Sequence, residues 1–249
     1  MKHQCSTVCV TQTPLRDGVL HLLSAVRNEE WTLQRILDAD QRERVGTEAA
    51  PEIKDLLARA SAARRTATAM LREVAAGRPA NGCAPVDAPP AGSWEATHAD
   101  AHDAMTALFT AVTAATEDQL AEDPGKRRNH PQYFWRDVVI YAARGPMGEY
   151  AEWHQRQGRM LEGLGVLSRW YEAVRGTNLP TKALSDASYD LACGFARAGR
   201  GDDAMAFLPD AFVYNDRPAV PVLKAWARED PDLASLTARA DFRTLVGAN

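Results

Sequence analysis

The sequence predicts an all-α protein, and three observations support this fold class. Apolar residues recur at intervals of three and four over several long segments, which is the periodicity of a helix with one buried face. Alternating polar and apolar runs, which would indicate half-buried strands, are absent, and β-branched residues are scattered. Residues 77–92 hold four prolines and three glycines, and the helical pattern resumes after them. Four long helices joined by such loops predict a helical bundle.

The first two long helices are expected over about residues 14–39 and 51–76. Thr13 is a suitable N-cap for the first helix, because Pro14 then takes the first helical position, where its missing N–H costs nothing. The second helix has an alanine-rich apolar stripe that permits close helix–helix approach, and Gly77 ends it.

The third helix is expected from Trp94 to about Thr116, with Ser93 as its N-cap. The fourth segment, about 131–175, is the longest with helical periodicity. Because Pro146 follows a glycine inside this segment, we expect the helix to kink or restart there.

The sequence predicts three regions along the chain. Residues 1–12 are polar and without pattern, and we expect them to be disordered. Residues 13–178 are expected to form the bundle, and residues 179–249 a smaller helical segment. In that segment, residues 189–208 fit a pair of helices with small residues at their crossing, followed by helical pieces on either side of Pro231.

Composition excludes several classes of function. The net charge of −4 and the pI of about 5.9 do not favour nucleic-acid binding, which needs a basic field. The four cysteines form no C-x-x-C pair, so we expect reduced thiols in a cytoplasmic protein. We also expect no secretory signal and no membrane contact, because no apolar run is long enough. A small-molecule partner is expected, and a homodimer is left open.

Two tracts resemble a known superfamily. The sequence PEIKDLLAR over Pro51–Arg59, and RGPMGEYAEWH over Arg144–His154, resemble the DinB-like four-helix bundle superfamily, in its small-molecule modifying and self-protection branch. The resemblance spans roughly residues 15–170 and implies a DinB-like up–down bundle. Its metal-binding members use three histidines, and the matching positions here are Arg59, Tyr150 and His154. Since arginine stays protonated and tyrosine is a poor ligand for zinc or nickel, the resemblance implies no metal and no cofactor in this chain.

A second resemblance concerns the C-terminal segment. The sequence YDLACGFARAGRGDDA over Tyr189–Ala204 is similar to one tetratricopeptide unit, and WAREDPDLASL over Trp226–Leu236 is similar to the tail that closes such arrays. A single unit cannot bury its own apolar face. We therefore expect a tetratricopeptide-like appendage that packs on the bundle or on another subunit.

The candidate catalytic residues are Arg59, Tyr150 and His154, which the resemblance brings together at one end of the bundle. Tyr150 and His154 are four residues apart and so share a helix face. His154 would act as general acid or base, Tyr150 would donate to a developing oxyanion, and Arg59 would clamp a carboxylate. The alternative is a structural polar network, with Arg59 paired to a glutamate such as Glu149 or Glu152.

Aromatic residues on three predicted helices are candidate substrate-binding groups. Trp31, Trp94, Tyr141 and Trp153 would either line a pocket for a planar ligand or belong to the core. Asp137 lies four residues before Tyr141 and would supply a second acid to that pocket, or would lie on the surface.

A pair of histidines, His98 and His102, has the spacing that can hold a metal on one helix face. The sequence offers no third ligand for them. We expect both to lie in the solvated first turns of the third helix.

These observations favour a metal-independent enzyme that acts on a reactive or natural-product small molecule by hydrolysis, ring-opening or isomerisation. Self-protection of a producing organism is one role for such an enzyme. Two alternatives stay open: a non-catalytic protein that sequesters a ligand or binds another protein through the same fold, and a metal-dependent thiol transferase.

Overall fold

The computed structural model describes residues 14–46, 52–78, 87, 92–121, 135–177, 181–213 and 219–247, with the side chains of 135–145 and 181 excepted. The expected disorder of residues 1–12 lies outside this part of the chain. Every element in the described part is helical, so the all-α prediction is confirmed there. The elements are α1 (Leu15–Ile36), α2 (Ala39–Glu43), α3 (Ile53–Ala75), α4 (Trp94–Ala114), α5 (Glu117–Ala121), α6 (Trp135–Arg156), α7 (Met160–Arg175), α8 (Thr181–Arg197), α9 (Gly201–Val213), α10 (Val220–Glu229), the 3-10 helix η2 (Pro231–Leu236) and α11 (Ala240–Val246). None of the described helices combines the length and apolarity needed to cross a membrane.

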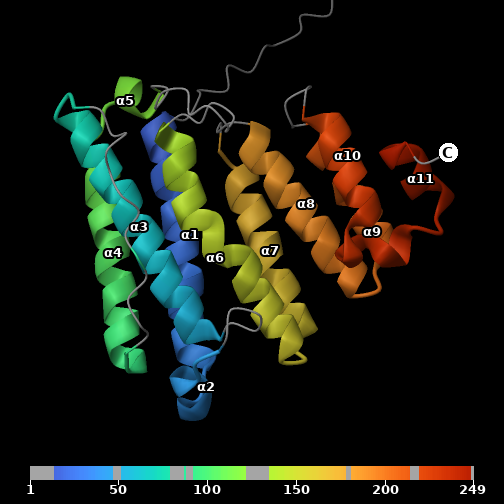
Figure 1. The fold of residues 1–249 in the computed structure, drawn as a ribbon, viewed down its shortest axis with the longest axis horizontal. Coiled ribbons are helices and arrows are strands. Elements are labelled where there is room, and N and C mark those ends of the chain that lie inside the picture. Colours follow the sequence, from blue (N-terminus) through green and yellow to red (C-terminus); the bar gives the residue numbers. More distant parts are fainter. Residues whose placement is uncertain are drawn as a thin grey trace, which may run out of the picture.

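Four long helices, α1, α3, α4 and α6, pack around one core. α1 and α3 each lie against both α4 and α6, which closes the group (Figure 1). The core side of α1 carries Val19, Leu22 and Val26, which are fully buried, and Leu108 of α4 is fully buried as well. Each buried aliphatic side chain of this kind contributes about 1.5–3 kcal/mol relative to an exposed one.

Two consecutive helices of this group, α3 and α4, run in the same direction. The carboxylate of Glu43 accepts the backbone N–H of Trp94 (3.0 Å) and contacts Nζ of Lys54 (3.2 Å), so α4 and α3 begin beside the same side chain. α6 runs the opposite way, since Trp153 near its end donates to Glu52, just before α3 (3.1 Å). The expected up–down alternation is therefore wrong for α3 and α4, whose starts share one end of the bundle (Figure 1).

Of the two expected alternatives at Gly145-Pro146, a kink or a restart, the restart is wrong. α6 continues through Pro146, because a proline removes only one backbone hydrogen bond when the surrounding turns stay packed. The chain reverses instead at Gly158, which has a φ of +76°. There the N–H of Arg159 donates to the carbonyl of His154 (2.9 Å), which closes the end of the helix. This ending needs a residue with left-handed backbone angles, and glycine adopts them without strain. The result is a fifth long helix, α7, packed on α1 and α6.

The C-terminal helices extend the array beyond the bundle. α8 packs on α7, and α9 folds back on α8 after Gly199, so the expected helical pair is present (Figure 1). Close packing of α7 on α8 depends on Gly194, where a Cβ atom would lie 2.6 Å from Cδ1 of Leu167. η2 and α10 then lie beside α8 and α9 and border the cleft described below.

Candidate functional site

The three expected catalytic residues do not converge on a shared cavity. Tyr150 and His154 are buried on α6, but Arg59 lies on the exposed side of α3, so the expectation is wrong for Arg59. The buried stripe of α3 includes Ile53, Leu57 and Arg64, and residue 59 projects away from it. The arginine inside the bundle is therefore Arg64, which is 0% exposed.

Arg64 belongs to a buried network that joins α3, α1 and α6. Its Nη1 donates to Oε2 of Glu30 (3.1 Å), and its Nη2 donates to Oε1 of the same carboxylate. The phenol of Tyr150 also donates to Glu30 Oε1 (2.9 Å). Burial, followed by the negative charge of Glu30, holds the pKa of Tyr150 well above its ordinary value. The phenol proton thus stays in a hydrogen bond to Glu30. This is a structural polar network, as in the alternative to catalysis given above, but its arginine and glutamate are Arg64 and Glu30.

His154 is one helical turn beyond this network and is 3% exposed. Its ring packs edge-on against Trp153, with the ring centroids 5.1 Å apart, and its Nδ1 has no hydrogen-bond partner among the described residues. Burial, with a smaller contribution from Arg159, lowers the pKa of His154. The imidazole is therefore neutral near pH 7.

The expected aromatic pocket does not form from the described residues. Trp94 and Trp153 are buried in the core, whereas Trp31 is 42% exposed and lies under the guanidinium of Arg27, 5.2 Å from its ring centroid. Asp137 and Tyr141 lie outside the residues whose side chains the structure describes.

The histidine pair is only partly solvated. His102 is exposed as expected, but His98 is half-buried with its ring 5.7 Å from that of Trp94. Burial lowers the pKa of His98. In the described part of the chain, neither histidine belongs to a group of three metal-ligating side chains.

A cleft of about 660 Å³ lies elsewhere, between α6, α8 and the segment formed by α10 and η2. One face of α8 supplies Tyr189, Cys193 and Arg197, which follow one another at intervals of four and so project together. α10 supplies Trp226. On the α6 side Gly148 leaves the wall open, since a Cβ atom there would have no neighbour within 4 Å.

The described lining of the cleft is acidic. Six carboxylates face two cationic side chains, Lys182 and Arg197, an excess of four negative charges when all are ionised. The carboxylates are Glu149, Glu152, Asp186, Asp190, Asp230 and Asp232. Burial raises the pKa of Asp232, and the carboxylates of Asp230 and Glu152 raise it further against the opposing effect of Arg197. Burial is the largest cause of this shift, and Arg197 offsets part of it.

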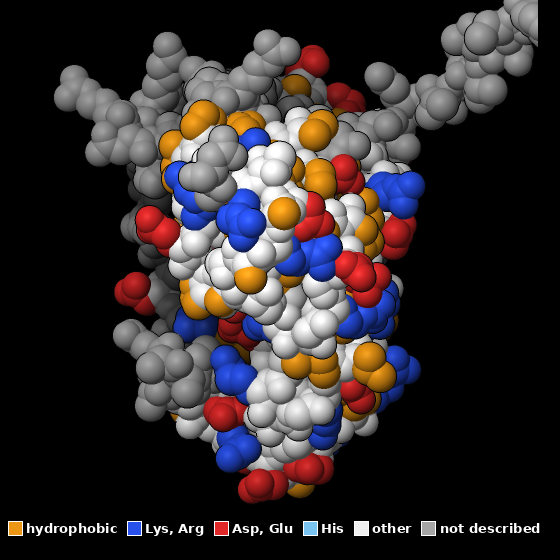
Figure 2. Space-filling model, turned by 90° about the vertical axis from the view of Figure 1, so that its right-hand side faces the viewer, with side chains coloured by type: hydrophobic (Ala, Val, Ile, Leu, Met, Phe, Trp, Pro, Cys, Tyr) orange, Lys and Arg blue, Asp and Glu red, His pale blue; other side chains and the backbone are white. Residues whose placement is uncertain are grey.

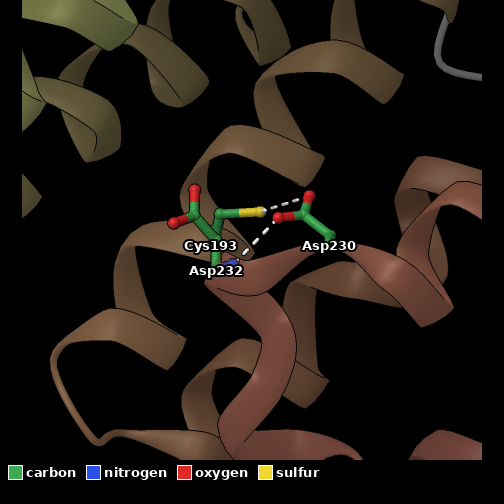
Figure 3. Close-up of side chains that lie close together, drawn as sticks. All are labelled: Cys193, Asp230 and Asp232. Carbon is green, nitrogen blue, oxygen red and sulfur yellow. Dashed lines mark hydrogen bonds between the residues drawn. The ribbon is translucent and has the colours of Figure 1, made fainter. Parts of the chain in front are cut away.

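Asp230 links η2 to α8 at the cleft. It accepts the backbone N–H of Asp232 (2.9 Å), which caps η2 (Figure 3). It also accepts the phenol of Tyr189 (2.8 Å), which ties η2 to α8. The Tyr189 ring lies nearly parallel to that of Trp226, with an interplanar angle of 18° and centroids 6.2 Å apart. Together these two rings form an aromatic wall on one side of the cleft.

Cys193, Asp230 and Asp232 are the described group closest to a metal site, since one ligand atom from each lies within 4.8 Å of the others (Figure 3). Burial, followed by the charge of Asp230, raises the pKa of the Cys193 thiol, which therefore stays protonated at neutral pH. Asp232 is ion-paired with Arg197. A divalent ion would have to deprotonate the thiol and displace the guanidinium, so these residues fit a metal poorly.

Sequence reasoning missed this cleft although its residues stand in tracts that were singled out. Tyr189 and Cys193 were assigned to a repeat-like tract, and Trp226, Asp230 and Asp232 to the tract that closes it. Their helical spacing was the available signal, because it places acidic and aromatic groups on shared faces. The contact between α8 and η2, which forms the cleft, depends on tertiary packing and cannot be predicted from the spacing of residues within one helix.

Comparisons with protein-family models, with curated proteins and with solved structures gave no match to this chain. The two resemblances described above therefore stay predictions. The fold and the cleft together define an all-helical protein with an acidic, aromatic-walled cavity where its C-terminal helices meet α6.

Proposed function

We propose that this chain is a non-catalytic small-molecule-binding protein that holds its ligand in the cleft between α6, α8 and the α10–η2 segment. One observation carries the proposal: three elements far apart in the sequence enclose about 660 Å³ and line it with charged and aromatic side chains. Ligand sites in proteins commonly have about 300–1,000 Å³ and this mixture of apolar walls and placed polar groups. Sequestration of a small molecule is one of the roles expected from the sequence.

Binding is favoured over catalysis by the state of the reactive groups in the cleft. The phenol of Tyr189 donates to Asp230, and burial raises its pKa, so it is a poor general acid or base near pH 7. The thiol of Cys193 is held in its protonated, weakly nucleophilic form. No histidine is among the described residues that line the cleft.

The resemblance to the DinB-like superfamily is compatible with a small-molecule ligand. Its small-molecule branch implies a ligand for the chain, and the closed packing of α1, α3, α4 and α6 is compatible with a bundle of that kind. The proposed ligand site lies outside that group of four, at the contact with α8.

The proposal is tested by filling the cleft from Gly148. A Cβ atom at this position would have no neighbour within 4 Å, and Gly148 lines the cleft. Gly148→Phe should therefore place its ring in the cavity, and Gly148→Ala is the matched control. Ligand-induced shifts in melting temperature are measured with panels of cationic, neutral and anionic small molecules.

We expect at least one panel to raise the melting temperature of the unsubstituted protein and of Gly148→Ala, but not that of Gly148→Phe. If no panel stabilises the unsubstituted protein, or if Gly148→Phe responds equally well, the cleft is not a ligand site.

A further inference from the structure

We infer that the ligand of this cleft is a planar aromatic compound that stacks on the wall formed by Tyr189 and Trp226. The inference rests on the proposed function and names its ligand class. It is carried by the exposure of Trp226, by the common orientation of the two rings and by the open space on the α6 side of the cleft.

Trp226 is a large apolar side chain that the fold leaves in water. It is 64% exposed, whereas Trp94, Trp153 and Trp170 are each 2% exposed or less. Trp31 is also exposed, but it is not among the residues that line the cleft. Covering an aromatic ring removes a large apolar surface from water, which is favourable. A ligand on Trp226 would therefore gain contact area that no described part of the chain uses.

The two rings of the wall share one orientation. Their planes differ by 18°, and their centroids are 6.2 Å apart. The ring of Tyr189 is held in place, because the residue is 8% exposed and its phenol donates to Asp230 (2.8 Å). A flat ligand can lie parallel to both rings at once, in the offset stacking that aromatic pairs favour. A saturated ring system is puckered and would contact the same wall at fewer points.

The rest of the apolar lining leaves room for a flat ring system. Leu167 of α7 and Leu223 of α10 also line the cleft. On the α6 side, a Cβ atom at Gly148 would have no neighbour within 4 Å. The volume of about 660 Å³ is in the range that binds small organic molecules. A planar compound thus has apolar surface to stack on and space beside it.

The charged side chains of the cleft do not set the charge of the ligand, because they interact within the chain. Asp186 lies 3.4 Å from Nζ of Lys182, and Asp232 is ion-paired with Arg197. Each of the six carboxylates in the described lining has an interaction partner in the chain. Figure 2 shows Lys and Arg interspersed with Asp and Glu on the C-terminal face of the molecule. The aromatic wall is therefore the part of the lining that remains for recognition.

The test compares β-naphthol, a flat pair of fused aromatic rings, with decahydro-β-naphthol, its saturated and puckered counterpart. Both are uncharged near neutral pH and carry one hydroxyl group. The saturated compound has no less apolar surface, so burial alone would not favour β-naphthol. Equilibrium dialysis against the full chain should give a dissociation constant about tenfold lower for β-naphthol, because each aromatic pair contributes roughly two- to tenfold.

Three variants locate the preference on the wall. Trp226→Leu keeps an apolar side chain but removes the ring, so it should weaken β-naphthol binding several-fold and change the binding of the saturated compound by less than about twofold. Trp226→Phe retains a ring and should keep most of the preference. Trp31→Leu is the matched control, since it removes an exposed tryptophan of α1 outside the cleft, and it should change neither affinity. Circular dichroism of each variant confirms its folding.

The outcomes separate this inference from the proposed function. Equal binding of the two compounds, or a preference that Trp226→Leu leaves intact, overturns the aromatic-ligand inference and leaves a ligand site in the cleft. An equal loss of β-naphthol binding in Trp31→Leu also overturns it. If neither compound binds but one of the broader panels stabilises the protein, the inference fails and the proposed function stands. If no compound of either kind binds, both fail.

Discussion

The difference between Arg59 and Arg64 shows how strongly one residue's position on a helix sets its role. Both arginines are on α3, yet Arg59 is exposed and Arg64 forms a two-point contact with Glu30 inside the bundle. A guanidinium that is fully removed from water depends on its counter-charge, because the cost of desolvation remains when the partner is removed. Glu30 is therefore central to the stability of the bundle.

We expect Glu30→Gln to destabilise the protein by about 3–5 kcal/mol, since it leaves Arg64 buried beside a neutral amide. Arg59→Gln should change the free energy of unfolding by less than about 0.5 kcal/mol, as is usual for an exposed site. Urea denaturation followed by circular dichroism measures both values. Similar effects of the two substitutions would show that Arg64 and Glu30 do not form the buried pair.

A second prediction at this scale concerns His154. Burial is the main cause that lowers its pKa, followed by the charge of Arg159. Glu162 and Glu29 oppose the shift, and Arg169 adds the smallest lowering effect. The unfolded chain takes up a proton near the ordinary histidine value of about 6.5, whereas the folded chain resists it. The stability associated with neutral His154 is therefore present above about pH 6.5 and is lost as pH falls towards the folded pKa.

The free energy of unfolding should fall between about pH 7.5 and about pH 5.5, and His154→Phe should reduce the size of that fall. Because other groups also titrate over this range, the informative quantity is the difference between the slopes of the two proteins. Parallel slopes would mean that His154 does not resist protonation in the folded state.

At the scale of elements, two glycines have opposite effects on stability: Gly148, inside α6, and Gly158, just after the end of α6. Gly148 lies within α6 with open space beside it, whereas Gly158 has a φ of +76° and closes the turn into α7. Gly148→Ala should stabilise the protein by about 0.5–1 kcal/mol through helix propensity. Gly158→Ala should destabilise it by about 1–2 kcal/mol, because a side chain disfavours the left-handed conformation.

Thermal or urea denaturation of these two variants tests the position of the helix break. Effects of the same sign would contradict it. A restart of the helix at Gly145-Pro146 would instead predict little cost for an alanine at Gly158.

The predictability of the elements follows the strength of their local signals. α1, α3 and α4 were placed within about three residues of their observed ends, because proline, Ser93 and Gly77 mark those ends locally. The separation of α6 from α7 was missed because the proline was given more weight than Gly158. A packed helix can absorb one missing hydrogen bond, but a left-handed residue with favourable capping bonds reverses the chain.

At the scale of the whole molecule, the candidate site depends on how the segments pack, and this limited the sequence prediction. Tyr150 and His154 were correctly assigned to one face of a helix, but their surroundings come from Glu30 and Arg64, which periodicity alone does not pair. The cleft likewise needs Tyr189 to meet Asp230, 41 residues away. Such contacts between distant segments cannot be inferred from local spacing.

The central claim is that a ligand enters the cleft walled by Tyr189 and Trp226, and the indole N–H signals of the six tryptophans test it most directly. In a nitrogen–proton correlation spectrum, the Trp226 signal is assigned by its loss in Trp226→Phe. Titration with a compound that raises the melting temperature of the protein should shift this signal most, while those of the buried Trp94, Trp153 and Trp170 stay in place. A titration in which the Trp226 signal does not move, or in which another indole moves more, would contradict the account.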